Sequence, residues 1–194
     1  MAALVTLLGG PDEFTKRLNF LHESGLLYMG EEQAFLTVFL YHYSGRPGLS
    51  AKRAHAYIPK EFNNTINGIP GNDDSGAMGS FVTLTMMGVF PNPGQDVYFI
   101  TPPFFQEISI VNSQTGKTAT IRNINFDARY KNIYIQSALR DGNIWTKNWI
   151  DHSFFAEGGV LELTLGPEES KWGTRNEDLP PSMSTKARDA KDLI

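Results

Sequence analysis

The sequence predicts an α+β fold in which a helical half precedes a half built of strands. Apolar residues recur at helical spacing in the first ninety or so positions, and short β-branched and aromatic runs follow Gly94. A Pro-Asn-Pro-Gly segment at residues 91–94 separates the two patterns. Helices followed by strands are typical of an α+β domain or of two packed lobes. We therefore expect residues 1–94 to be helical, 95–166 to be β-rich and 167–194 to form a polar tail.

Four helices are expected in the first half. They are a segment that Pro11 opens and Gly25 stops, a segment from Glu32 to Tyr43, a third capped by Ser50 and disturbed at Pro59, and the run from Phe81 to Val89. His42 and His55 fall on these helices among aromatic residues, which favours structural histidines. Apolar residues also begin within a few positions of Met1, which suggests that partner structure lies upstream of this chain.

The strands expected in the second half are short. They are residues 97–100, 108–111, 118–121, 133–137 and 160–165. Asp141-Gly142 is typical of a hairpin turn. The last strand alternates apolar and polar residues, as a strand with one solvated face does. From Gly166 onward the chain is polar, charged and proline-containing, so we expect a loose tail.

Composition excludes several functional classes. The chain has 194 residues, a net charge of -4 and no cysteine. Without a basic surface, nucleic acid is not expected as the main partner. No apolar run is long enough to span a bilayer, so no membrane contact is expected. The absence of cysteine excludes disulfides, thiol catalysis and thiolate metal sites. Residues 1–8 are too short for a secretory signal, which leaves the compartment open.

The most informative stretch is Gly68–Ser80. Asn72, Asp73 and Asp74 lie among glycines, directly before an apolar run. Glycine lets a backbone turn sharply and approach a ligand closely. Carboxylates on such a loop can act as a general base or as ligands of a hard cation. The alternative is that Asp73, Asp74 or Ser75 only caps the helix that follows.

Several blocks, in order, carry a resemblance to a known family. They are Gly9-Gly10 with Phe14, residues 28–33 (Tyr-Met-Gly-Glu-Glu-Gln), residues 40–47, the loop at 71–78, residues 88–91, residues 132–137 and Trp172-Gly173. From about Leu4 to Gly173 the chain resembles the carboxy-terminal third of glycoside hydrolase family 92, the calcium-dependent inverting α-mannosidases, in a fungal-type variant.

The resemblance implies an amino-terminal β-sandwich followed by an (α/α)6 barrel and a small strand-rich element. This chain would supply the last helices of the barrel and a small antiparallel β element. The upstream β-sandwich lobe, and the block that holds the family's catalytic acid, have no matching residues here. The chain therefore looks incomplete relative to the family.

The resemblance also implies roles for particular residues. Asp74 corresponds to the general base, and Asp73 and Asn72 would help to hold the attacking water. Ca²⁺ would grip sugar hydroxyls, with Glu31 and Glu32 as candidate metal ligands. Glu31 stands where the family has asparagine, and Gln33 where it has proline. The alternative for both glutamates is the first turn of a helix, where carboxylates interact favourably with the helix dipole.

The implied function is exo-α-mannosidase activity, on α-1,2-linked mannose of N-glycans, with little or no turnover by a chain that lacks the acid. A non-catalytic carbohydrate-binding or pseudoenzyme module is the first alternative, and calcium-dependent mannose binding without turnover would favour it. A scaffold piece without a ligand is the second. Residues 63–65 form an N-glycosylation acceptor triplet that matters only if the protein is secreted. An extracellular location would follow if a longer parent carries a signal peptide.

Overall fold

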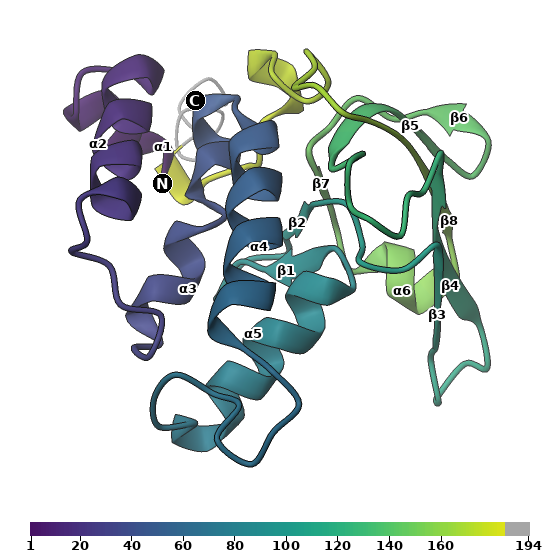
Figure 1. Ribbon diagram of the computed structural model, residues 1–194. Helices are drawn as coiled ribbons and strands as arrows, with labels where there is room; N and C mark the ends of the chain where they lie inside the picture. Colours follow the sequence, from purple (N-terminus) through teal and green to yellow (C-terminus); the bar gives the residue numbers. More distant parts are fainter. Residues whose placement is uncertain (185–194) are drawn as a thin grey trace.

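The helices of the amino-terminal half and the larger sheet lie on opposite sides of the molecule in the computed structural model, which describes residues 1–184 (Figure 1). The helical side comprises α1 (Ala2–Leu7), α2 (Pro11–Glu23), α3 (Gln33–Thr37), the 3₁₀ helix η1 (Leu40–Ser44), α4 (Pro47–Glu61), the short η2 (Asp74–Gly76) and α5 (Ala77–Met86). No helix within residues 1–184 combines the length and the apolar character needed to cross a membrane.

Three of the expected helices differ from the prediction. The helix expected from Phe81 to Val89 is α5, which begins at Ala77 and ends at Met86, so Val89 lies outside it. The segment from Glu32 to Tyr43 is not one helix, because α3 ends at Thr37 and a 3₁₀ helix follows, with all of its residues 40–44 buried. The left-handed Gly45 ends that tight turn. Helix α4 begins at Pro47, where a missing backbone N–H has no cost, and it continues through Pro59. Ser50 does not cap it.

The strands form two sheets. The strands are β1 (Val89–Pro91), β2 (Tyr98–Ile100), β3 (Glu107–Val111), β4 (Thr118–Ile124), β5 (Tyr134–Arg140), β6 (Asn143–Ile144), β7 (Trp149–Ile150) and β8 (Val160–Gly166), with α6 (Ser153–Glu157) before the last. The three-stranded sheet has the order β1-β2-β7, and the five-stranded sheet the order β3-β4-β8-β5-β6.

The expected antiparallel β element is corrected in one respect. Strand β8 inserts between β4 and β5, so it is antiparallel to β5 but parallel to β4, with Ile121 opposite Leu161. As a central strand it keeps the alternation that the sequence shows, with Leu161, Leu163 and Leu165 buried. The Asp141-Gly142 turn is confirmed: both residues have positive φ and join β5 to β6.

Strand β2 lies between two hydrophobic cores. Phe99 points into the core of the helical side, where its ring stacks 6.2 Å from that of Phe39. Its neighbour Ile100 points into the core of the five-stranded sheet. Successive side chains of a strand face opposite sides, so one short strand serves both cores. Residues beyond Gly94 therefore contribute directly to the helical core.

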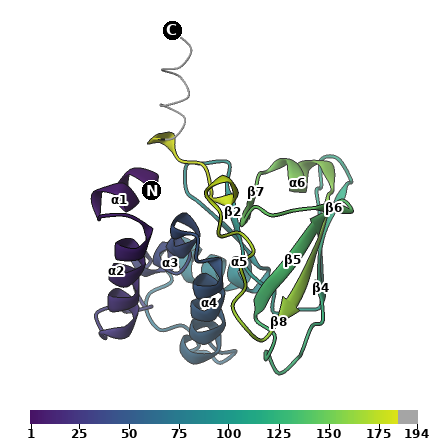
Figure 2. The same ribbon diagram turned by 90° about the horizontal axis from the view of Figure 1, so that it is seen from above.

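The segment after β8 packs against the body of the molecule, so the expectation of a loose tail is wrong for residues 167–184. In Figure 2 this segment runs between α4 and the five-stranded sheet. The Trp172 indole is buried and donates a hydrogen bond to the carbonyl oxygen of Trp145 (2.8 Å). Asp178, 2% exposed, accepts hydrogen bonds from Thr146 and Arg175. Residues 185–194 lie outside the described part of the chain.

Candidate active site

The loop between α4 and α5, residues 68–76, is here called the acidic loop. It ends in two left-handed residues, Ser75 (φ 60°) and Gly76 (φ 81°). The carboxylate of Asp73 accepts hydrogen bonds from the backbone N–H groups of Met78 (3.0 Å) and Gly79 (3.1 Å). These are first-turn donors that lack a partner within the helix. Asp73 thus performs the capping that the sequence offered as an alternative role, and it fixes the loop to α5.

Asp74 and Asn72 flank this cap and are exposed to solvent. Neither side chain forms a hydrogen bond or an ion pair with any other residue in the described range 1–184. A carboxylate that is free of partners but held on an anchored loop can accept a proton from a water molecule bound beside it. Of the two aspartates, only Asp74 has a carboxylate with no hydrogen-bond or ion-pair partner among residues 1–184.

A second segment from a different part of the chain contacts the acidic loop. The hydroxyl of Tyr28 donates a hydrogen bond to the backbone carbonyl oxygen of Pro70. Beside it, the backbones of Gly30 and Gly71 lie so close that a Cβ atom on Gly71 would overlap the Gly30 carbonyl group. Only glycine permits this approach. The structure thus brings together the two blocks that the sequence analysis singled out.

Glu31 and Glu32 follow this contact at the amino end of α3. Glu32 occupies the N-cap position, and the backbone N–H groups of Ala34 and Phe35 donate to the carbonyl oxygens of Glu31 and Glu32. Both glutamates therefore lie just before α3, and neither is in its first turn, where the alternative interpretation expected them.

The fit of these residues to Ca²⁺ is limited. Carboxylates are the ligand type that calcium prefers, and it takes roughly six to eight oxygens. Within residues 1–184, no three His, Cys, Asp or Glu side chains gather closely enough to hold a metal ion. These residues do not by themselves form a calcium site.

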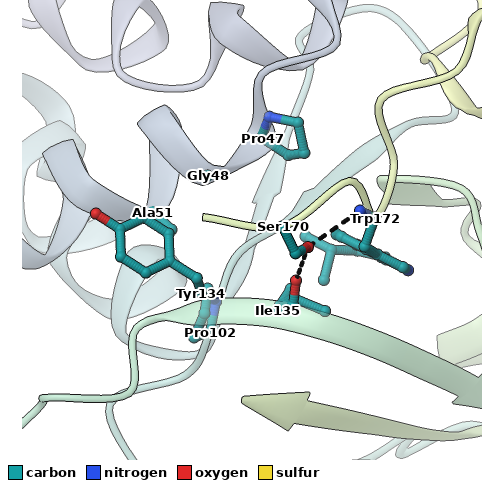
Figure 3. Close-up of a pocket in the computed structure, with 9 residues that line it drawn as sticks. Pro47, Gly48, Ala51, Pro102, Tyr134, Ile135, Ser170 and Trp172 are labelled. Carbon is teal, nitrogen blue, oxygen red and sulfur yellow. Dashed lines mark hydrogen bonds between the residues drawn. The ribbon is translucent and has the colours of Figure 1, made fainter. Parts of the chain in front are cut away.

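An open groove of about 470 Å³ runs along the start of α5 beside the acidic loop. Its lining residues are Asp73, Gly76, Gly79, Ser80, Thr83 and Leu84. A cavity elsewhere, between α4 and β5, holds only about 10 Å³ (Figure 3). Ser170 is one of its lining residues and donates a hydrogen bond to the carbonyl oxygen of Ile135. That cavity has room for about one water molecule and cannot admit a sugar.

The histidines on the helices are structural. His42 is fully buried, and its ring nitrogens lie 2.9 Å and 3.0 Å from the carbonyl oxygens of Phe39 and Ile100. His55 stacks on Phe104 with a centroid separation of 4.1 Å. Burial lowers the pKa of each imidazole to about 4. Both stay neutral near pH 7 and lie away from the acidic loop, as the sequence interpretation expected.

A polar cluster between α2 and α4 was not predicted. The hydroxyl of Tyr41 and the guanidinium of Arg53 both donate to the side-chain oxygen of Asn19 (2.9 Å and 3.3 Å), and Arg53 also pairs with Glu23 at 2.5 Å. The four-residue spacing of Asn19 and Glu23 on one helix was the available signal. These contacts join the two helices that lead into the Tyr28–Glu32 segment and the acidic loop.

The sequence of this chain matches a known family of proteins. The family model described as "Glycosyl hydrolase family 92 catalytic domain" matches residues 1–167. An uncharacterized secreted glycosidase of Arthroderma benhamiae is 62% identical over 183 residues, which cover 94% of this chain and 24% of that protein. The chain thus spans about a quarter of the length of this relative.

Solved structures show the same fold. A family GH92 α-mannosidase from Bacteroides thetaiotaomicron has a TM-score of 0.82 at 24% identity, over 90% of this chain and 24% of its own. That enzyme has also been solved with mannoimidazole. A family GH92 inverting mannosidase from the same organism gives 0.82 at 24% identity, over 93% of this chain and 28% of its own. From the family match and the 62% identical relative together, this chain belongs to glycosyl hydrolase family 92.

Proposed function

We propose that the protein is an inverting exo-α-mannosidase that acts on α-1,2-linked mannose of N-glycans. Asp74 is the general base, and a catalytic acid comes from outside residues 1–184. The observation that carries this proposal is the geometry of the acidic loop. Its Asp74 carboxylate is free and exposed, while Asp73 and the Gly30–Gly71 contact hold the backbone on either side. The mannosidases of the same fold, one of them inverting, support the reaction type.

In the proposed reaction Asp74 takes a proton from a water molecule while the oxygen of that water attacks the anomeric carbon. The bond from that carbon to the leaving oxygen breaks, and the acid protonates that oxygen. In inverting glycosidases the two carboxyl groups lie roughly 6.5 to 9.5 Å apart, which leaves room for the water. Asn72, which is exposed two residues before Asp74, would donate to the same water. Asp73 supports the base by holding the loop and contributes its second carboxylate oxygen to the water site.

Calcium has a restricted place in this proposal. Glu31 and Glu32 are the described residues that would share a Ca²⁺ ion, and its other ligands would come from sugar hydroxyls, water and residues outside this chain. When bound, the ion would orient sugar hydroxyls. No proton transfer is assigned to it, because the described residues do not complete its ligand shell.

We propose that an upstream β-sandwich lobe packs against this chain and that the helices complete an (α/α)6 barrel. The support is an apolar face on α1, α2 and the segment that follows α2. Leu7, Phe20 and Leu26 are 82%, 62% and 67% exposed. Phe20 and Leu26 also line a groove of about 370 Å³, together with Leu4 and Leu18. Clustered exposed apolar side chains mark surfaces that another structure covers. A relative about four times as long has the residues to do so.

We propose that the protein passes through the secretory pathway and is located outside the cell. The support is the Arthroderma benhamiae relative, which is described as secreted and is 62% identical.

The function is tested on the native protein purified from its source cells and on a recombinant copy of that native form. The assay follows mannose release from an α-1,2-linked mannobiose, with the anomer formed first identified by NMR. Asp74→Asn should lower kcat by roughly 100- to 10,000-fold and leave Tm unchanged, because the side chain has no partner. Asp12→Asn removes the same charge from an exposed position on α2 and should retain activity. Mannose binding by an unmutated protein that releases no mannose would instead establish the carbohydrate-binding alternative.

A further inference from the structure

A short exposed loop separates the end of α4 from the acidic loop. Phe62 is buried and anchors its start, and the backbone N–H of Asn63 donates to the carbonyl oxygen of Gly68 (2.9 Å). The Gly68 N–H donates in turn to the carbonyl oxygen of Thr65 (3.0 Å). Residues 63–67 project from this closed base, and Ile66 is fully exposed.

Asn63-Asn64-Thr65 in this loop is the only Asn-x-Ser/Thr triplet in the sequence. The side-chain oxygen of Asn63 accepts hydrogen bonds from both the backbone N–H (3.1 Å) and the hydroxyl (2.5 Å) of Thr65. The amide nitrogen, Nδ2, forms no hydrogen bond with any residue among those described. Asn63 itself is exposed to solvent, so a transferase can reach it.

We propose that Asn63 is an N-glycosylation site of this protein. The proposal rests on the proposed secretory location, because the transfer takes place in that compartment. The donor is an oligosaccharide carried on a lipid pyrophosphate. Nδ2 of Asn63 bonds to the anomeric carbon of the first sugar, and the bond from that carbon to the phosphate oxygen breaks. The lipid pyrophosphate leaves with the electron pair, and the amide proton passes to a base of the transferase.

The position has two consequences. A glycan on Asn63 would lie over Ile66, so it would cover the most exposed apolar side chain among the described residues. It would also lie a few residues before Pro70, at the edge of the acidic loop, without replacing any contact that holds that loop. The glycan is therefore expected to improve solubility and to leave the turnover of mannoside unchanged.

The test uses native protein captured from the culture fluid and the cells of its source by an antibody against this chain. A protease that cleaves after acidic residues yields a peptide of residues 62–73. An amidase that removes N-glycans converts the glycosylated asparagine to aspartate, and in H₂¹⁸O it marks that residue with the heavy isotope. Fragment ions must place the mark on Asn63, because Asn67 precedes Gly68 and deamidates spontaneously.

We expect the mark on Asn63 in protein recovered outside the cell. Thr65→Ala should abolish it, Thr65→Ser should retain it, and Asn64→Gln, next to the acceptor, should leave it unchanged. Secreted protein with an unmodified Asn63 would overturn this site while leaving the secretory location intact. Native protein found only in the cytosol, and unmodified, would overturn the location and the modification together.

Discussion

The hydroxyl of Tyr28 donates a hydrogen bond to the backbone carbonyl oxygen of Pro70 and so joins two segments that lie 42 residues apart in the sequence. One segment leads into the glutamates at the start of α3, and the other carries the candidate general base. Beside this bond, Gly30 and Gly71 pack backbone against backbone. The candidate site is therefore held from two sides, by this contact and by the Asp73 cap on α5.

The Gly30–Gly71 contact predicts opposite effects for two glycine substitutions. Gly71→Ala would drive a methyl group into the Gly30 backbone and should destabilise the fold by roughly 1 to 3 kcal/mol. Gly79→Ala adds a methyl group in α5 where no atom lies within 4 Å. Alanine is a better helix former, so this variant should be more stable by up to about 1 kcal/mol. Urea unfolding of the two variants measures both changes, and equal effects would contradict the contact.

The Asp73 cap predicts a difference between alanine and asparagine. Asp73→Ala removes the acceptor for Met78 and Gly79 and should cost about 1 kcal/mol of stability. Asp73→Asn keeps a side-chain oxygen at the same place and should retain most of that stability. The melting temperatures of both variants, compared with that of the wild type, measure these changes in stability. If the alanine variant unfolds at the wild-type temperature, Asp73 does not anchor the loop.

Three histidines on the helical side, of which His42 is buried and His22 and His55 are half-buried, predict a loss of stability in acid. The pKa values of His22, His42 and His55 are lowered to about 4, chiefly by burial, from an ordinary value near 6.5. Between these pH values the unfolded chain binds protons that the folded chain does not, so stability is full above pH 6.5 and falls as the pH drops toward 4. For the fully buried His42 the loss is of the order of 3 kcal/mol.

Denaturant unfolding at several pH values between 7.5 and 4.5 measures this slope. His55→Phe keeps an aromatic ring stacked on Phe104 but cannot titrate. It loses the contact of Nε2 with the carbonyl oxygen of Pro102, so it should be less stable at pH 7.5 yet show a shallower slope. If the unfolding free energy of this variant falls with pH as steeply as that of the wild type, His55 does not contribute to the loss of stability in acid.

Because the proposed function takes its catalytic acid from outside residues 1–184, the isolated 194-residue chain is predicted to release little or no mannose; loss of one proton-transfer group typically costs roughly 100- to 10,000-fold. Calcium should raise its Tm only slightly, since Glu31 and Glu32 alone do not complete a ligand shell. Mannose release by the purified chain that Asp74→Asn abolishes would contradict the first expectation. A rise of many degrees with calcium would contradict the second.

Local patterns in the sequence determined the helical half, most of the strands and the hairpin turn at Asp141-Gly142. Spacing and turn chemistry act over a few residues, so the sequence displays them directly. The acidic loop was also visible, because glycines beside carboxylates form an unusual local combination. What the sequence left open was whether Asp73 or Asp74 caps the helix, since both can reach the first turn.

Only the tertiary structure decided the remaining questions, because each depends on contacts between distant residues. The packing of Gly30 on Gly71, the insertion of β8 parallel to β4 and the burial of Trp172 join segments that no local pattern relates. The same holds for the 3₁₀ turn at Leu40–Ser44, where complete burial overrides the helical periodicity. The sequence thus determined which residues could form the site, and the fold decided which aspartate holds the loop and which has an exposed carboxylate without a partner among residues 1–184.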